Sequence, residues 1–251
     1  MRLFVLLCSL FFVTVSLAEP THSSPLIERP KVLFFDVNET LLDLAPMRES
    51  VGQALEGREE LLPLWFSTML HHSLVDSATK RYHDFGTIGV AALMMVAESN
   101  GIAMTEQAAR QAIVTPLRSL PPHPDVKAGL QALKDAGFTL VSLTNSSRKG
   151  VATQFKNAGL TYFFERQLSV EDIRLYKPNL GAFEWALEQM GIQPEEGMLV
   201  AAHGWDVAGA RAAGMQAAFV SRPGKTLYPL AIEPTLIVPD IQALADQLTA
   251  D

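Results

Sequence analysis

Short apolar runs alternate with helical patterns along most of this chain, and this alternation constrains the fold more than any other feature. We expect five β-strands, each apolar along nearly its whole length, at residues 31–35, 138–144, 197–202, 216–221 and 235–239. Such strands are typical of a parallel sheet whose two faces are both covered by helices. Helical patterns lie between them, at 125–137, 179–191 and 206–214. The sequence therefore predicts an α/β fold, with a Rossmann-like parallel sheet core and helices on both faces.

The segment after the first strand interrupts this alternation. From Leu44 to about Leu120 we find no convincing strand, but four helical segments, at 47–57, 61–80, 87–101 and 105–120. A proline-rich stretch at 119–126 marks the return to the sheet. We therefore predict a helical cap at 44–119, inserted after the first strand of a core that is formed by 31–43 and 120–251.

The first eighteen residues differ in composition from the rest of the chain. Arg2 precedes an apolar run over 3–15, and small residues lead to Ala18. This pattern is typical of a secretory signal peptide that is cleaved after Ala18, while the run is short for the alternative, an uncleaved membrane anchor. We predict a signal peptide at 1–18, a linker at 19–30 and an exported protein, periplasmic or secreted. The only cysteine, Cys8, lies in the signal peptide, so the mature chain would form no disulfide or thiolate site.

Polar side chains gather where the predicted strands end. In an open parallel sheet, ligands bind at the carboxyl ends of the strands. Each such residue alone has a local explanation, as a helix N-cap, a turn former or a solvated lysine. Their occurrence in order, at the ends of one sheet, indicates a site instead. The candidates are Asp36, Asn38, Thr40, Thr144, Asn145, Lys177, His203, Trp205 and Asp206.

Four of these motifs resemble those of the haloacid dehalogenase-like superfamily. The matching segments are FFDVNET (34–40), LTNS (143–146), LYKP (175–178) and AAHGWD (201–206). The resemblance covers essentially the whole chain after the predicted signal peptide, and the helical insert lies where this superfamily has its cap. It implies a covalent mechanism in which Asp36 is the nucleophile and Lys177 orients its carboxylate. Thr144 or Asn145 would then bind the substrate or the leaving group.

Two departures distinguish this chain from the phosphatases of the superfamily. Those enzymes have a second Asp two residues after the nucleophile, as a general acid, where this chain has Asn38, which cannot donate and recover a proton at neutral pH. They also bind Mg²⁺ through an acidic residue four or five positions before the residue equivalent to Asp206. These positions are Ala201 and Ala202, and neither side chain can bind a cation that requires oxygen. We therefore expect no metal and no cofactor, and a phosphatase-like hydrolase is the less favoured alternative.

The metal-free pattern, with Trp205-Asp206 and the following AGAR, is similar to the type II (S)-2-haloacid dehalogenases. This resemblance implies that Asp36 attacks C2 of an (S)-2-haloacid and displaces halide, which gives an ester. A water positioned by Lys177 and Asp206 would then release the (R)-2-hydroxyacid. The resemblance also implies a small-molecule substrate and a homodimer formed through the helical insert. The net charge of −7, without any cluster of basic residues, argues against a nucleic-acid partner.

Three further departures concern the substrate pocket. The dehalogenases have an Arg on the cap that helps to draw off the halide, and here the residue is Phe66, which we keep as a candidate substrate contact. They have a Tyr about six residues after the motif Lys, and here Phe183 takes its place. His203 stands where that family commonly has Asn. Since a missing cation costs transition-state stabilisation in a dry site, a third hypothesis is a catalytically impaired homologue that only binds a small acid or a partner protein.

Overall fold

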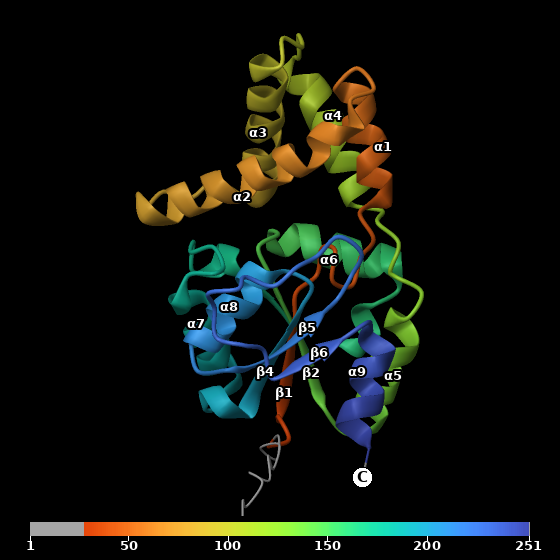
Figure 1. Ribbon diagram of the computed structural model, residues 1–251, viewed down its shortest axis with the longest axis vertical. Helices are drawn as coiled ribbons and strands as arrows, with labels where there is room; N and C mark the ends of the chain where they lie inside the picture. The colour runs from red at the N-terminus through yellow and green to blue at the C-terminus, as the bar shows by residue number, and fades with distance from the viewer. Residues whose placement is uncertain (1–27, 251) are drawn as a thin grey trace, which may run out of the picture.

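The computed structural model describes residues 28–250, in which six parallel strands form one sheet (Figure 1). Their order across the sheet is β3-β2-β1-β4-β5-β6, so the first strand lies in the middle, paired with β2 and β4. The strands are β1 (Val32–Phe35), β2 (Thr139–Thr144), β3 (Arg166–Ser169), β4 (Gly197–Ala201), β5 (Gln216–Val220) and β6 (Leu236–Val238). The predicted signal peptide and most of the predicted linker lie outside the described residues, and both stay predictions.

Helices cover both faces of the sheet. Helices α5 (Val126–Asp135), α6 (Arg148–Ala158) and α9 (Ile241–Thr249) pack on one face, and α7 (Leu180–Met190) and α8 (Gly204–Ala212) on the other. Alternate residues of β1 serve the two faces: Leu33 and Phe35 join the first cluster, and Val32 and Phe34 join the second. Burial on both faces explains why the strand is apolar throughout. The predicted α/β fold is confirmed.

Four helices between β1 and α5 form a cap, which stands over the carboxyl ends of the strands (Figure 1). They are α1 (Ala45–Ala54), α2 (Leu62–Ala78), α3 (Phe85–Ser99) and α4 (Glu106–Leu117). Helices α2 and α3 approach closely at Gly89, where an added Cβ would lie 3.0 Å from the Met69 sulfur and where Trp65 Nε1 donates to the backbone oxygen at 2.8 Å. Within residues 28–250, no helix combines the length and the apolar character needed to cross a membrane.

Three elements of the core are not among those the sequence predicted. Strand β3 lies at the edge of the sheet and begins with the exposed Arg166 and the half-buried Gln167, so it lacks a continuous apolar run. Helix α6 begins directly after a motif segment, with Ser147 as its N-cap, and α9 begins after the N-cap Asp240. Serine and aspartate are favoured N-cap residues, so both could have indicated the start of a helix. Short 3₁₀ turns lie at Glu59–Leu61, Thr161–Phe163, Val170–Asp172 and Pro194–Glu196.

Candidate active site

Asp36 follows the central strand directly, and three side chains hold its carboxylate. Thr40 Oγ1 donates to Oδ2 at 2.8 Å, Lys177 Nζ lies 3.2 Å from Oδ1, and His203 Nδ1 lies 3.2 Å from Oδ2. Burial alone would raise the pKa of Asp36, but the Lys177 ammonium and the His203 imidazole lower it well below its usual range. Asp36 is therefore an ionised carboxylate in a fixed orientation, at the point where a parallel sheet binds ligands.

Lys177 is completely buried between two carboxylates. Its Nζ lies 2.6 Å from Asp206 Oδ2 as well as 3.2 Å from Asp36 Oδ1. Burial opposes its charge, but Asp206 and Asp36 together raise the pKa of Lys177 above its ordinary value. Burial also raises the pKa of Asp206 to about 6, against the effect of Lys177. Asp206 thus holds the ammonium from behind, while its Oδ1 has no hydrogen-bond partner among the described residues.

Asn145, at the end of β2, fixes the backbone of Lys177. Its Oδ1 accepts from the Lys177 N–H at 3.0 Å and its Nδ2 donates to the Lys177 carbonyl at 3.4 Å. The neighbouring Thr144 Oγ1 accepts from the Ser146 N–H at 3.1 Å. Within the described structure, neither side chain is hydrogen-bonded to Asp36. Both residues shape the site through the backbone, and their roles in substrate binding stay predictions.

Asn38 and Thr40 order the turn that follows Asp36. Asn38 Nδ2 donates to Ser146 Oγ at 3.1 Å, and its Oδ1 accepts from Gln154 Nε2 at 2.9 Å. The Asn38 amide thus uses its donor toward Ser146 and its acceptor toward Gln154. Thr40 Oγ1, which donates to Asp36, accepts from the Ala202 N–H at 2.9 Å.

Both ring nitrogens of His203 face carboxylates. Nε2 lies 2.8 Å from Glu39 Oε2, opposite the contact of Nδ1 with Asp36. Burial lowers the pKa of His203, but the Asp36 and Glu39 carboxylates raise it to about 9. Lys225 Nζ pairs with Glu39 Oε1 at 2.5 Å, so charges of opposite sign alternate from Asp36 to Lys225.

Asp36, His203, Glu39 and Lys225 form a row of alternating charges. The sequence did not predict two members of this row, Glu39 and Lys225. Glu39 lies inside the first motif, but its backbone φ of 63° places it in the left-handed region, and no sequence pattern reveals the direction of its side chain. Lys225 lies in a loop after β5 without any motif. The loop lies against Gly204, where an added Cβ would be 2.4 Å from the Thr226 carbonyl oxygen. A larger residue at Gly204 would displace the loop that carries Lys225.

The aromatic candidates stack on the imidazole. The ring of Phe66, from cap helix α2, lies 5.8 Å from that of His203 at 13° between the planes, and the Trp205 ring lies 5.0 Å away at 25°. Phe66 and His203, two of the departures from the family pattern, are therefore in contact. Phe183, the third, is fully buried between the sheet and α8, where it packs close to Gly209.

The residues present do not fit a magnesium ion. Within residues 28–250, no group of three or more His, Cys, Asp or Glu side chains is arranged to hold a metal. The carboxylates of Asp36 and Asp206 share the Lys177 ammonium, which takes the space between them. Ala201 and Ala202 are buried and offer no side-chain oxygen. We therefore assign no step to a metal.

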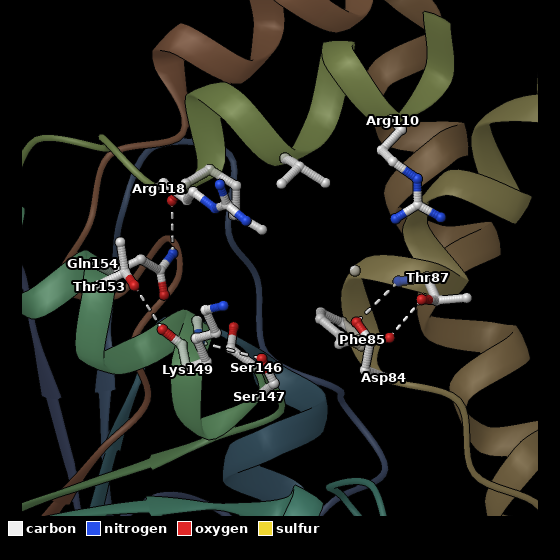
Figure 2. Close-up of a pocket in the computed structure, with 14 residues that line it drawn as sticks. Asp84, Phe85, Thr87, Arg110, Arg118, Ser146, Ser147, Lys149, Thr153 and Gln154 are labelled. Carbon is white, nitrogen blue, oxygen red and sulfur yellow. Dashed lines mark hydrogen bonds between the residues drawn. The ribbon is translucent and has the colours of Figure 1, made fainter. Parts of the chain in front are cut away.

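Two cavities border the site on its cap side. The larger, of about 200 Å³, lies between the cap and the start of α6, and three cations line it: Arg110, Arg118 and Lys149. Figure 2 shows Asp84, Thr87 and Arg110 on one side of this cavity, and Ser146, Ser147 and Lys149 on the other. The smaller cavity, of about 20 Å³, is mostly apolar and lies at Asn38 and Phe66. Within the described structure Asp36 lines neither cavity; the larger one, which we call the mouth, lies outside the reacting groups.

The two cavities are adjacent and share part of their lining. The shared residues are Phe85, Gly86 and Leu117, all from the cap. On the core side, Ser146 and Gln154 line the mouth and also bind the Asn38 amide. Asn38 thus lines the apolar cavity and is hydrogen-bonded to two residues that line the larger one.

This fold and site define a class: capped α/β proteins with a fixed, ionised carboxylate at the end of the first and central strand. A family model described as haloacid dehalogenase-like hydrolase matches residues 30–214, and the chain belongs to this family. The resemblance seen in the motifs is confirmed.

Curated relatives and solved structures agree with this assignment. The chain is 28% identical over 217 residues to "(S)-2-haloacid dehalogenase H-109" of Pseudomonas putida, which covers 86% of this chain and 96% of that protein. It is 28% identical over 219 residues to "Haloacetate dehalogenase H-2" of Moraxella sp. (strain B), covering 87% and 97%. The L-2-haloacid dehalogenase structure from Xanthobacter autotrophicus, described with chloropropionic acid covalently bound, is 25% identical, with a TM-score of 0.79 over 87% of this chain and 98% of that one.

Proposed function

We propose that this protein hydrolyses the carbon–halogen bond of a small 2-haloacid, the (S) enantiomer, through a covalent ester on Asp36. The observation that carries this proposal is the Asp36 carboxylate, which Thr40, Lys177 and His203 hold ionised at the centre of the sheet. Relatives named as haloacid dehalogenases support the reaction class, and the covalently bound chloropropionic acid of one relative supports the ester.

In the first step, an Asp36 oxygen attacks C2 of the haloacid from the side opposite the halogen. The carbon–halogen bond breaks, the halide leaves with its electron pair, and C2 is inverted. A halide leaves without a proton, so no general acid is needed at Asn38, whose amide is hydrogen-bonded to Ser146 and Gln154. The step needs an ionised nucleophile, and the low pKa of Asp36 supplies it.

In the second step, water attacks the side-chain carbonyl carbon of Asp36 and the (R)-2-hydroxyacid leaves. Negative charge develops on the carbonyl oxygen, and Lys177 Nζ, 3.2 Å from Oδ1, is placed to stabilise it. Asp206 keeps this ammonium in position from the opposite side. Asp36 returns to its ionised form, so the protein is a catalyst and not a reagent.

The test is halide release from the two enantiomers of 2-chloropropionate, with and without EDTA. We expect release from the (S) enantiomer that EDTA does not change, and a loss of about 10³-fold or more in Asp36→Asn, because the nucleophile is gone. Asp135→Asn, on the exposed part of α5, is the matched control and should retain full activity. A single turnover in H₂¹⁸O should place ¹⁸O in the peptide that contains Asp36.

Two results would contradict the proposal. The first is turnover of a phosphate ester that requires Mg²⁺, which would indicate a phosphatase-like hydrolase. The second is binding of 2-chloropropionate without any halide release from chloro-, bromo- or fluoro-acids. That outcome would indicate a homologue that only binds a small acid.

A further inference from the structure

The mouth between the cap and the core has cations that no group of the protein neutralises. Arg110, Arg118 and Lys149 all line it. Within residues 28–250, the side chains of Arg118 and Lys149 form no ion pair and no hydrogen bond, and Arg110 has only an exposed pair with Glu106 at 3.0 Å. Exposed cations are often merely solvated. These three differ because they surround one cavity, which also contains other unsatisfied polar groups.

The acid that lines the mouth is engaged elsewhere. Asp84 is the N-cap of α3, where its Oδ1 accepts from the Thr87 N–H at 3.1 Å and its Oδ2 accepts from the Thr87 hydroxyl at 2.5 Å. Among the described residues, Asp84 forms no ion pair with any of the three cations. The described lining therefore has an excess of positive charge and calls for an anion.

The core wall of the mouth contains an unsatisfied buried oxygen. Helix α6 begins in this wall, with Ser147 as its N-cap, but a helix start alone does not define a ligand site. Gln154, further along α6, also lines the mouth and is buried. Its Nε2 donates to Asn38 Oδ1 at 2.9 Å and to the Leu117 carbonyl at 3.0 Å, while its Oε1 has no partner among the described residues. A buried acceptor of this kind calls for a hydrogen-bond donor.

The lining also restricts the size and shape of a ligand. Arg110 lies on the cap side of the mouth and Lys149 on the core side (Figure 2). Cations on opposite walls suit two separate anionic groups better than one compact anion. Phe85, Val114 and Leu117 belong to the same lining and suit a short carbon chain. A volume of about 200 Å³ is below the range of about 300–1,000 Å³ typical of sites for drug-sized ligands, so the ligand is small.

We infer that the mouth binds a small dicarboxylate that carries a hydroxyl group. One carboxylate binds Arg110, the other binds Arg118 and Lys149 beside the start of α6, and the hydroxyl group donates to Gln154 Oε1. A carboxylate bound to a guanidinium is among the stronger hydrogen-bonded pairs in proteins. Because this ligand contacts both the cap and the core, it holds the two together. The site lies outside the reacting groups, so the inference goes beyond the proposed function and does not depend on it.

The experiment is titration calorimetry of the full chain with malate, at an ionic strength held constant with NaCl. We expect one malate per chain, bound about tenfold or more tightly than lactate, which has the hydroxyl group but only one carboxylate. Succinate, which lacks the hydroxyl group, should bind severalfold more weakly than malate. Inorganic phosphate, a compact anion, should also bind more weakly. The melting temperature should rise with the logarithm of the malate concentration above its Kd.

The variants test the cations of the two walls. Arg118→Gln/Lys149→Gln should weaken malate binding about tenfold or more, and Arg110→Gln should weaken it severalfold. Arg118, Lys149 and Arg110 are exposed, so the variants should fold like the parent protein. Lys127→Gln/Lys134→Gln on α5 is the matched control, since it removes the same charge away from the mouth and should leave the Kd for malate unchanged.

Hydrogen exchange locates the bound ligand. Malate should slow amide exchange in peptides from both walls of the mouth, 84–87 on the cap and 146–154 on the core, because the ligand contacts both. Asp36→Asn should bind malate as the parent protein does, since Asp36 does not line the mouth.

Each of the other results contradicts the inference. Malate that binds no more tightly than lactate, or equally in the parent and in Arg118→Gln/Lys149→Gln, would show that the mouth is not a dicarboxylate site. Phosphate that binds as tightly as malate would make it a site for compact anions. Equal affinities for malate and succinate would show that Gln154 binds no hydroxyl group. Binding that changes only in Asp36→Asn would place malate among the reacting groups. Halide release is not measured here, so failure of the proposed function leaves these results unchanged.

Discussion

Asp36 and His203 lie 3.2 Å apart, and each changes the titration of the other. The imidazole lowers the pKa of Asp36, while Asp36 and Glu39 outweigh burial to raise that of His203 to about 9. A buried charge is stable only when its partners are close and hydrogen-bonded. The charge state of each residue therefore depends on the whole row from Asp36 to Lys225. A single substitution in this row changes the pKa of several groups.

The first prediction at this scale concerns stability and pH. The pKa of His203 is about 9 in the folded protein against an ordinary value of 6.5, so its charge stabilises the fold fully below about pH 6.5. This contribution is lost as pH rises through about 9. We expect the free energy of unfolding of the parent protein, relative to His203→Gln, to fall by up to about 3 kcal/mol between about pH 6 and pH 10.

Denaturant unfolding across this pH range is the measurement, with His71→Gln as the control. The difference in the free energy of unfolding between the parent and His71→Gln should not fall in this way between about pH 6 and pH 10. A difference between the parent and His203→Gln that is constant over the range would show that His203 is not protonated in the fold.

At the scale of elements, the turn from Val37 to Leu42 gives the site its shape. Arg222, after β5, donates to the Thr40 carbonyl from Nε at 3.3 Å and from Nη2 at 3.0 Å. Asp125 binds the same guanidinium at two points, at 2.7 and 2.9 Å, and also accepts from the Ile241 N–H at the start of α9. The nucleophile turn is thus braced by residues from the far end of the chain.

Asp125→Asn should weaken this brace. We expect a loss of about 2 kcal/mol in the free energy of unfolding, because the buried guanidinium loses its charged partner. We also expect kcat for halide release to fall about tenfold with KM nearly unchanged, since Thr40 would no longer hold Asp36 firmly. Denaturant unfolding and steady-state kinetics measure both effects.

Glu106→Gln is the matched control, because it breaks the exposed pair with Arg110 on α4 and should change stability by less than about 0.5 kcal/mol. If the two substitutions changed stability and kcat equally, the contact of Asp125 with Arg222 would not be what holds the turn after Asp36.

The sequence allowed the layers of the fold and the candidate residues at the strand ends to be predicted, because apolar periodicity and motif order are local. Asp36, Lys177, Asp206 and His203 are indeed neighbours in space. The partners that control their charges or hold the turn after Asp36 were not predictable. Glu39, Arg222 and Lys225 reach the site through a left-handed backbone turn and through loops, and side-chain direction there depends on tertiary packing.

At the scale of the whole molecule, the cap rests on the core beside the reacting groups. Tyr176, just before Lys177, receives cap contacts: its N–H donates to Ser77 Oγ at 3.0 Å, and its hydroxyl donates to the His83 carbonyl at 2.5 Å. The cap also forms one wall of the cationic mouth (Figure 2). A chain with a net charge of −7 therefore presents a local concentration of positive charge at this cavity, which would attract the anionic acid of the proposed reaction.

This arrangement predicts that kcat/KM for 2-chloropropionate falls as ionic strength rises from about 0.02 to about 0.5 M. The double variant Arg118→Gln/Lys149→Gln should lower kcat/KM about threefold to tenfold at low salt and reduce its salt dependence, with kcat unchanged. The control is Lys127→Gln/Lys134→Gln on α5, which lies away from the cap (Figure 1). An equal salt dependence in both double variants would contradict a role for the mouth.

The central position of β1 also determines when, during synthesis of the chain, the parts of this site become available. Asp36 is synthesised early, yet its neighbouring strand β4, its cation Lys177 and its brace at Arg222 follow much later, and Ile241 last of all. A nascent chain therefore carries the nucleophile long before its partners can orient it and shield it from water. The complete site forms only when synthesis is almost finished. A truncated chain should therefore show no activity of Asp36 as a nucleophile.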